Sequence, residues 1–113
     1  MKSLLMYNQN GDLITRMYQW DKSQAITVKG LPVSPLPEFR FSNINHQTEI
    51  TVVPAVIGTD MTAIVPDLLL EEPTPIHAYI YRPASTGAIR TLGEISIEVL
   101  PRRNPREYTD SEI

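Results

Sequence analysis

Short segments in which apolar and polar residues alternate recur along the whole chain. In the clearest of them, 38–42, Phe39 and Phe41 point to one side and Arg40 to the other. A period of two places one side chain in a core and the next in solvent, so such a segment predicts a half-buried β-strand. Segments that alternate in this way, or that are rich in β-branched and aromatic residues, are 3–7, 13–18, 24–29, 38–42, 49–53, 61–65, 75–81 and 92–100.

Ten prolines separate these segments and leave almost no stretch that could form a regular helix. Asn10-Gly11 predicts a tight hairpin turn, because both residues tolerate positive φ. One helical turn is expected at 67–72, since Pro66 suits the first position of a helix. Strands at this spacing, about seven or eight in number, predict an all-β antiparallel sandwich, immunoglobulin-like or jelly-roll-like, or an open barrel.

The length of 113 residues suits a single domain. We expect the sandwich to span 1–101. After Pro101 the chain has little to bury, so 102–113 is expected to be a charged tail or linker. Arg102 and Arg103 lie in a basic cluster that acidic residues follow at once, which is typical of a solvated surface.

Composition excludes several classes of site and partner. The chain has no cysteine, so disulfides, thiolate metal sites and cysteine nucleophiles are excluded. A net charge of −3 gives no electrostatic reason to expect nucleic acid. The first apolar run is too short for a secretory signal, and no run approaches the ~20 apolar residues of a membrane helix. We expect synthesis in the cytoplasm, with neither a membrane nor nucleic acid as partner.

The residues that could carry chemistry are scattered. His46 and His77 are isolated, and no carboxylate stands at metal-ligand spacing from either, so a surface role is expected for both. Glu94 and Glu98 share the polar face of one segment, as on any half-exposed strand, although paired carboxylates can also act as acid and base. Phosphate loops, nucleophile elbows and calcium loops are not found. The sequence therefore predicts no catalytic residue, metal or cofactor, and no enzyme activity.

Three aromatic residues are candidates for a binding surface. Tyr79 and Tyr81 point to the same side of one predicted strand, and Trp20 follows the end of another. Exposed, such rings could stack on a sugar or anchor a protein partner. Alternatively, Trp20 closes one end of the core and the tyrosines cover its rim.

Four stretches of the chain, the third of them in two parts, resemble a group of phage and prophage proteins of Firmicutes-type gut bacteria. The similar proteins carry a Trp-Asp pair before a strand, a Pro-Glu-aromatic strand, a Pro-Asn/Asp-Leu-Leu turn, an Ala-Tyr-Ile/Val-Tyr strand and a terminal Pro-Arg-x-x-Pro-x-x-Tyr. The matching residues are Trp20-Asp21, Pro37-Glu38-Phe39, Pro66-Asp67-Leu68-Leu69, Ala78-Tyr79-Ile80-Tyr81 and Pro101-Arg102-Arg103-Asn104-Pro105-Arg106-Glu107-Tyr108. The resemblance covers 19–112, so the opening hairpin, 1–18, is expected to be an accessory element.

This resemblance implies a structural role in a bacteriophage virion. The expected functions are a capsid decoration or head-fibre module, or a baseplate or tail-fibre adaptor that acts through protein–protein contacts. Its partners would be other virion proteins, and a homo-oligomer is expected. In the tail, Arg102, Arg103 and Tyr108 are candidate partner contacts. The alternative is a carbohydrate-binding, lectin-like module that uses the three aromatic residues to bind a host-surface glycan.

Overall fold

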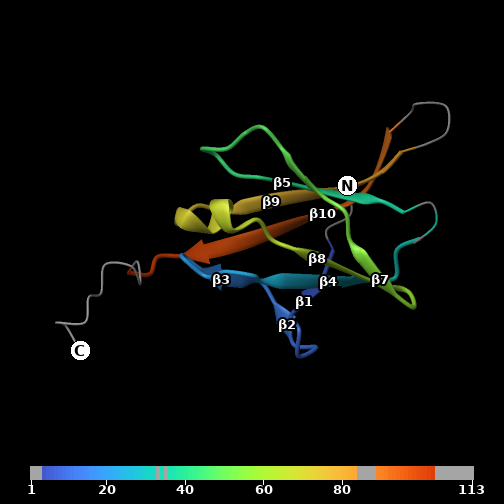
Figure 1. Ribbon diagram of the computed structural model, residues 1–113, viewed down its shortest axis with the longest axis horizontal. Coiled ribbons are helices and arrows are strands. Elements are labelled where there is room, and N and C mark those ends of the chain that lie inside the picture. The colour runs from blue at the N-terminus through green and yellow to red at the C-terminus, as the bar shows by residue number, and fades with distance from the viewer. Residues whose placement is uncertain (1–3, 33, 35, 84–88, 104–113) are drawn as a thin grey trace.

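The computed structural model describes residues 4–32, 34, 36–83 and 89–103, which form two five-stranded sheets around one core (Figure 1). Sheet 1 has the order β2 (Leu13–Ile14), β1 (Met6–Tyr7), β4 (Ala25–Lys29), β8 (Asp60–Ile64), β7 (Ala55–Ile57). Sheet 2 has the order β3 (Arg16–Tyr18), β10 (Ile89–Leu100), β9 (Ile76–Pro83), β5 (Glu38–Ser42), β6 (Ile50–Val52). The predicted all-β sandwich is confirmed.

Alternating side chains from both sheets fill the core. On β5, Phe39 and Phe41 are fully buried, and their ring centroids lie 6.2 Å apart. Burying a side chain of this size contributes about 1.5–3 kcal/mol, so these two rings are a large part of the driving force. The other fully buried large residues of the strands are Ile26, Val28, Met61, Ile76, Ile80 and Ile97. The inward faces predicted from alternation are therefore the faces that pack.

The strand order identifies the type of sandwich. The run β1-β4-β8-β7 corresponds to strands A-B-E-D of an immunoglobulin-type domain, and β6-β5-β9-β10 corresponds to C′-C-F-G. The jelly-roll form and the open barrel are not what the chain adopts. The pairing is antiparallel, as predicted, except that β3 runs parallel to β10, with Met17 opposite Val99.

The opening hairpin is integral to the sandwich, so its description as an accessory element is wrong. Met6 and Met17 are only 3% and 4% exposed, and the hairpin supplies strands to both sheets. The segment 13–18, predicted as one strand, divides at Thr15 into β2 and β3. Ile14 and Met17 would lie on opposite faces of a continuous strand, because they are an odd number of residues apart. The change of sheet lets both pack against the core.

The structure also has more strands than the seven or eight expected. The segment 49–53 contracts to β6, and the buried Pro54 follows it. Strand β7 was not predicted, because all three of its side chains are exposed and give no alternation. In Figure 1 the chain passes from β6 to β7 and so from sheet 2 to sheet 1, and both strands lie at the edges of their sheets.

Two local predictions are confirmed. Gly11 has φ +84°, and the side-chain oxygen of Asn8 accepts hydrogen bonds from the backbone N–H groups of Asn10 and Asp12, which closes the hairpin turn. The helical turn expected at 67–72 is the 3₁₀ helix η1 (Asp67–Glu71), which buries two leucines beneath the end of the sandwich.

Candidate functional site

The outer face of sheet 2 brings the two predicted tyrosines together with polar residues of β5. We call the outward residues of β5 and β9 the tyrosine face: Glu38, Arg40, Ser42, His77, Tyr79 and Tyr81. The ring centroids of Tyr79 and Tyr81 lie 6.0 Å apart, with 41° between the ring planes. Both side chains are half-buried, so they partly cover the sheet and partly face solvent.

Arg40 lies at the centre of this face. Its guanidinium carbon is 4.8 Å from the ring centroid of Tyr81, its Nη2 is 3.2 Å from a carboxylate oxygen of Glu38, and its Nη1 is 3.9 Å from one of Glu49. The Nε of Arg40 is buried and has no hydrogen-bond partner in the described part of the chain. Two carboxylates share one guanidinium, so the cluster suits a neutral or cationic ligand better than an anion.

The surroundings of Tyr81 keep its hydroxyl protonated. Partial burial raises its pKa above the ordinary value of 10.0, the charge of Glu49 raises it further, and Arg40 opposes the shift. A protonated phenol both donates and accepts hydrogen bonds. At neutral pH the ring therefore presents an uncharged polar edge.

One end of the tyrosine face opens into a pocket of about 520 Å³, lined by Ser42, Asn43, Ile44, Gln47, Thr74, Pro75 and His77. Asn43 is 4% exposed, and its side-chain oxygen accepts hydrogen bonds from the backbone N–H groups of Asn45 (3.0 Å) and His46 (2.7 Å). This arrangement fixes the loop that forms one wall. The amide, hydroxyl and imidazole groups of the lining can hydrogen-bond a neutral polar ligand.

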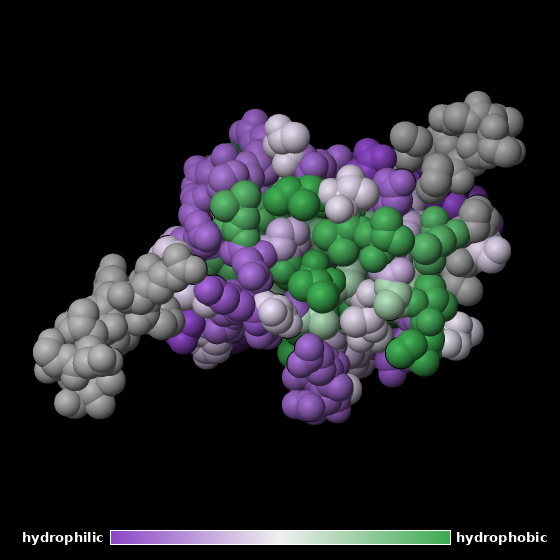
Figure 2. Space-filling view, viewed as in Figure 1, coloured by the Kyte–Doolittle hydropathy of each residue, from purple (hydrophilic) through white to green (hydrophobic). Residues whose placement is uncertain are grey.

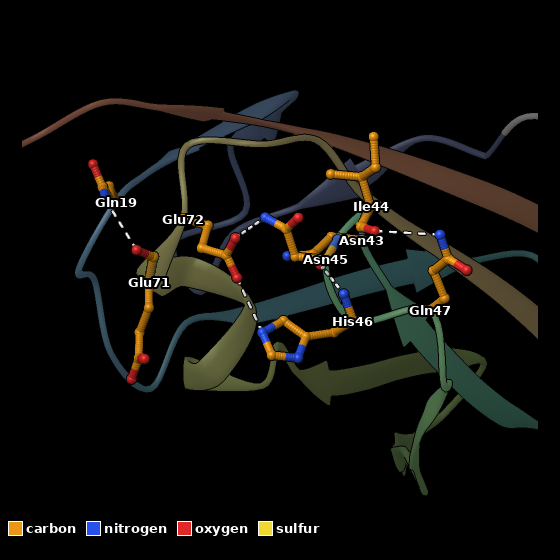
Figure 3. Close-up of polar contacts among 8 residues, drawn as sticks. All are labelled: Gln19, Asn43, Ile44, Asn45, His46, Gln47, Glu71 and Glu72. Carbon is orange, nitrogen blue, oxygen red and sulfur yellow. Dashed lines mark hydrogen bonds and ion pairs between the residues drawn. The ribbon is translucent and has the colours of Figure 1, made fainter.

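The loop is tied to the segment after η1 through one carboxylate. Glu72 accepts a hydrogen bond from the side-chain amide of Asn45, and its other oxygen lies 3.0 Å from Nε2 of His46 (Figure 3). The side chain of Gln47 donates to the carbonyl of Ile44. His46 is therefore half-buried and helps to hold the loop against the segment after η1. The sequence search missed the pocket, because its walls come from segments about thirty residues apart.

Trp20 lies in a different region, in the turn between β3 and β4. It has φ +72°, and its backbone N–H donates to the carbonyl of Leu70 at 2.7 Å. Arg102 is bound to the same turn: its Nε donates to the carbonyl of Gln19 at 2.9 Å, and its Nη2 is 3.5 Å from Asp21. The side chain of Gln19 in turn donates to the carbonyl of Glu71 at 2.9 Å, on the left of Figure 3.

The predicted site residues thus fall into two groups. Tyr18 pairs with Leu100, whereas Tyr79 pairs with Glu94. Six residues of β10 therefore separate the Trp20 end from the tyrosines, or about 20 Å at 3.3 Å per residue. A single surface that includes all three aromatic residues is not formed. Arg103 is exposed beside the Trp20 turn, and Tyr108 lies outside the described residues.

Catalysis and metal binding both require groups of polar side chains in a fixed arrangement. The Nδ1 of His77 is 3.2 Å from the Oγ of Ser96, its cross-strand neighbour, but within the described chain His77 forms no ion pair with a carboxylate that would orient its ring. These residues contain no group of three metal-ligating side chains. They also contain no helix long and apolar enough to cross a membrane.

No protein-family model, curated protein or solved structure matches the chain. The geometry of the sandwich and of its surfaces is therefore what bears on function.

Proposed function

We propose that the chain is a structural protein of a bacteriophage particle that works through protein–protein contacts and not through catalysis. The proposed roles are a capsid decoration or head-fibre module, or a baseplate or tail-fibre adaptor, located in the virion. Two things support the proposal: the resemblance of 19–112 to phage structural proteins, and an uncharged apolar edge of the sandwich.

This edge carries the proposal. Strands β6 and β7 are the terminal strands of their sheets, and both come from 50–59, a segment of ten residues without a charge. Val53 and Ile57 are 65% and 78% exposed. Figure 2 shows a broad apolar area across the visible face, reaching the corner where β7 lies in Figure 1. The edge strands are short and Pro54 separates them, which limits direct strand addition. The exposed apolar side chains and the lack of charge nevertheless favour a neighbouring subunit that covers them.

The test is competition for incorporation into particles. Val53→Asp places a charge on the edge at a solvent-exposed position, and Leu68→Asp places the same charge on an exposed leucine of η1 as the matched control. Circular dichroism first establishes that both variants fold. We expect purified particles to contain Leu68→Asp at the wild-type level and Val53→Asp at about a tenth of it or less. Equal incorporation of both variants would show that the edge formed by β6 and β7 takes no part in assembly.

The second candidate function is a carbohydrate-binding module. The tyrosine pair lies beside a mainly apolar pocket that also offers a few neutral hydrogen-bonding groups, and sugars are bound by stacking combined with polar contacts. The contact between Arg40 and the Tyr81 ring speaks against it, because the guanidinium occupies one side of that ring. Tyr79 would therefore be the stacking residue.

A glycan array followed by titration decides this alternative. Tyr79→Ala removes the ring next to the pocket, and Tyr18→Ala removes an exposed tyrosine at the other end of sheet 2. A lectin-like function requires binding of a glycan at millimolar affinity or better that Tyr79→Ala abolishes and Tyr18→Ala leaves intact. No binding by the wild-type chain would exclude it.

A further inference from the structure

The two outer faces of the sandwich differ in chemistry. Sheet 2 presents charged residues on β3, β5 and β10, whereas the outward residues of sheet 1 are mostly apolar or small. We call the latter the sheet 1 face: Tyr7, Leu13, Ala25, Thr27, Lys29, Ala55, Ile57, Asp60, Thr62 and Ile64. Lys29 and Asp60 are its only charged members. The outer face of an antiparallel sheet is usually polar where it meets water, so this composition indicates a covered surface.

Exposure of the largest side chains supports this reading. Leu13, Ile57 and Ile64 are 56%, 78% and 56% exposed, and none of the described residues covers them. At the centre of the face the hydroxyls of Thr27 and Thr62 bond each other at 2.9 Å, so neither requires water to be satisfied. A molecule that covers this face therefore has to be mainly apolar, with a negative group opposite Lys29 and a positive group opposite Asp60.

We propose that the occupant is the same face of a second copy of the chain. Strands β4 and β8 are antiparallel neighbours, with Thr27 opposite Thr62 and Lys29 opposite Asp60. The two copies are related by a two-fold axis that runs parallel to these strands, above the line midway between them. Strand β4 of each copy then lies over β8 of the other. Each residue of β4 then faces its own cross-strand neighbour in the second copy. Lys29 consequently faces Asp60 of the second copy, and Asp60 faces Lys29, so both charges are matched.

The same axis matches side-chain sizes. Tyr7 is in register with Thr27, and on the other flank Ala55 is in register with Thr62. The axis therefore places Tyr7 opposite Ala55 and Ala25 opposite Ile64, a large side chain against a small one, and each pair is formed twice. At the centre Thr27 faces Thr62.

The area of the face sets the strength of this contact. The strands that face each other across this axis, β1, β4, β8 and β7, comprise 15 residues. At about 3.4 Å per residue and about 4.8 Å between strands they cover roughly 250 Å² per copy, before the relief of the side chains is counted. Stable dimers bury about 800 Å² per partner. The dimer is therefore weak and concentration-dependent, which suits a subunit that is held at high local concentration on a particle. The role of this dimer on a particle rests on the proposed assembly function, whereas the geometry of the dimer contact depends on sheet 1 alone.

Sedimentation equilibrium of the full chain, from micromolar to millimolar concentration, tests the proposal. We expect a reversible monomer–dimer equilibrium. Ile64→Lys should weaken it by about ten-fold or more, because a lysine is then buried at the contact, and Leu68→Lys on η1 should leave it unchanged. Lys29→Glu should also weaken the dimer, and Lys29→Glu combined with Asp60→Lys should restore it. A monomer at all concentrations, or an Ile64→Lys dimer of wild-type strength, would overturn the proposal.

The absence of cysteine allows the contacting face to be mapped as well. A nitroxide on Thr59→Cys, in the exposed turn beside Asp60, should broaden amide resonances near Lys29 of an unlabelled, ¹⁵N-enriched chain. Broadening confined to the tyrosine face would contradict the two-fold arrangement. The outcomes also separate the two proposals: a monomer that is still incorporated into particles overturns the dimer alone, and a dimer missing from particles overturns the assembly function alone.

Discussion

Gly93 offers a sharp test of how the opening segment packs on β10. It lies where the register between β9 and β10 shifts, and a Cβ placed on it would come within 2.6 Å of Cδ1 and 2.7 Å of Cγ of Leu4. The backbone N–H of Leu4 donates to the carbonyl of Glu94 at 3.0 Å, so the leucine cannot withdraw without loss of that bond. Gly93→Ala should therefore overpack this contact.

The expected cost follows from two opposing effects. Overpacking costs about 1–3 kcal/mol, and the smaller conformational freedom of alanine in the unfolded chain returns about 0.4–1 kcal/mol. We expect Gly93→Ala to lower the free energy of unfolding by about 1–2 kcal/mol, measured by urea denaturation at unchanged slope. In the double variant with Leu4→Ala, the new methyl group fills space that the leucine vacated. The two changes should then couple favourably by about 1 kcal/mol.

Two results would refute this reasoning. One is a Gly93→Ala chain as stable as the wild type or more so. The other is strict additivity of the two substitutions, to within about 0.5 kcal/mol, because residues that do not touch behave in that way. Either result would mean that Leu4 does not lie against β10, and the integral role of the opening hairpin would lose its support.

Three other predictions concern the core, the pocket loop and the tyrosine face. Phe39→Ala should cost about 3–5 kcal/mol of unfolding free energy, because the ring is fully buried between the sheets. Asn43→Ala should cost about 1–3 kcal/mol by leaving two backbone N–H groups without their acceptor, whereas Asn43→Asp keeps the acceptor and most of the stability. In an alkaline absorbance titration, Tyr81 should ionise above pH 10.0; Tyr81→Phe should remove that transition, and Glu49→Gln should move it to lower pH. The pKa of Tyr81 is higher in the folded chain than in the unfolded chain. Its contribution to stability is therefore fully present below pH 10.0 and is lost as the pH rises from 10.0 through the folded-state pKa. An unchanged titration in Tyr81→Phe would contradict the assignment of this transition to Tyr81.

Much of the sandwich could be predicted because its central strands bury one face only. Alternation around Phe39 and Phe41, and along β9 and β10, reports directly which side chains enter the core. The turn at Gly11 could be predicted for a different reason, since positive φ restricts the choice of residue. These signals are local, and the structure confirms them.

Features that depend on the edges of the sheets could not be predicted. Strand β7 exposes all three side chains, so no alternation of apolar and polar residues marks it in the sequence. The break between β2 and β3 arises because both Ile14 and Met17 pack against the core, which one continuous strand would not allow. The pocket beside the tyrosine face forms where 42–47 meets 74–77, and no property of either segment alone indicates it. The separation of Trp20 from the tyrosines likewise follows from the length of β10, which places them near opposite ends of one sheet.

We propose that this chain is a subunit of a phage particle that acts through the surfaces of its sandwich. Quantitative mass spectrometry of particles purified from the strain that encodes the chain tests this proposal. We expect the chain in the particles at a fixed ratio to the major capsid or tail subunit, unchanged by further purification. Particles that carry no chain, or amounts that fall with each purification step, would overturn the proposal.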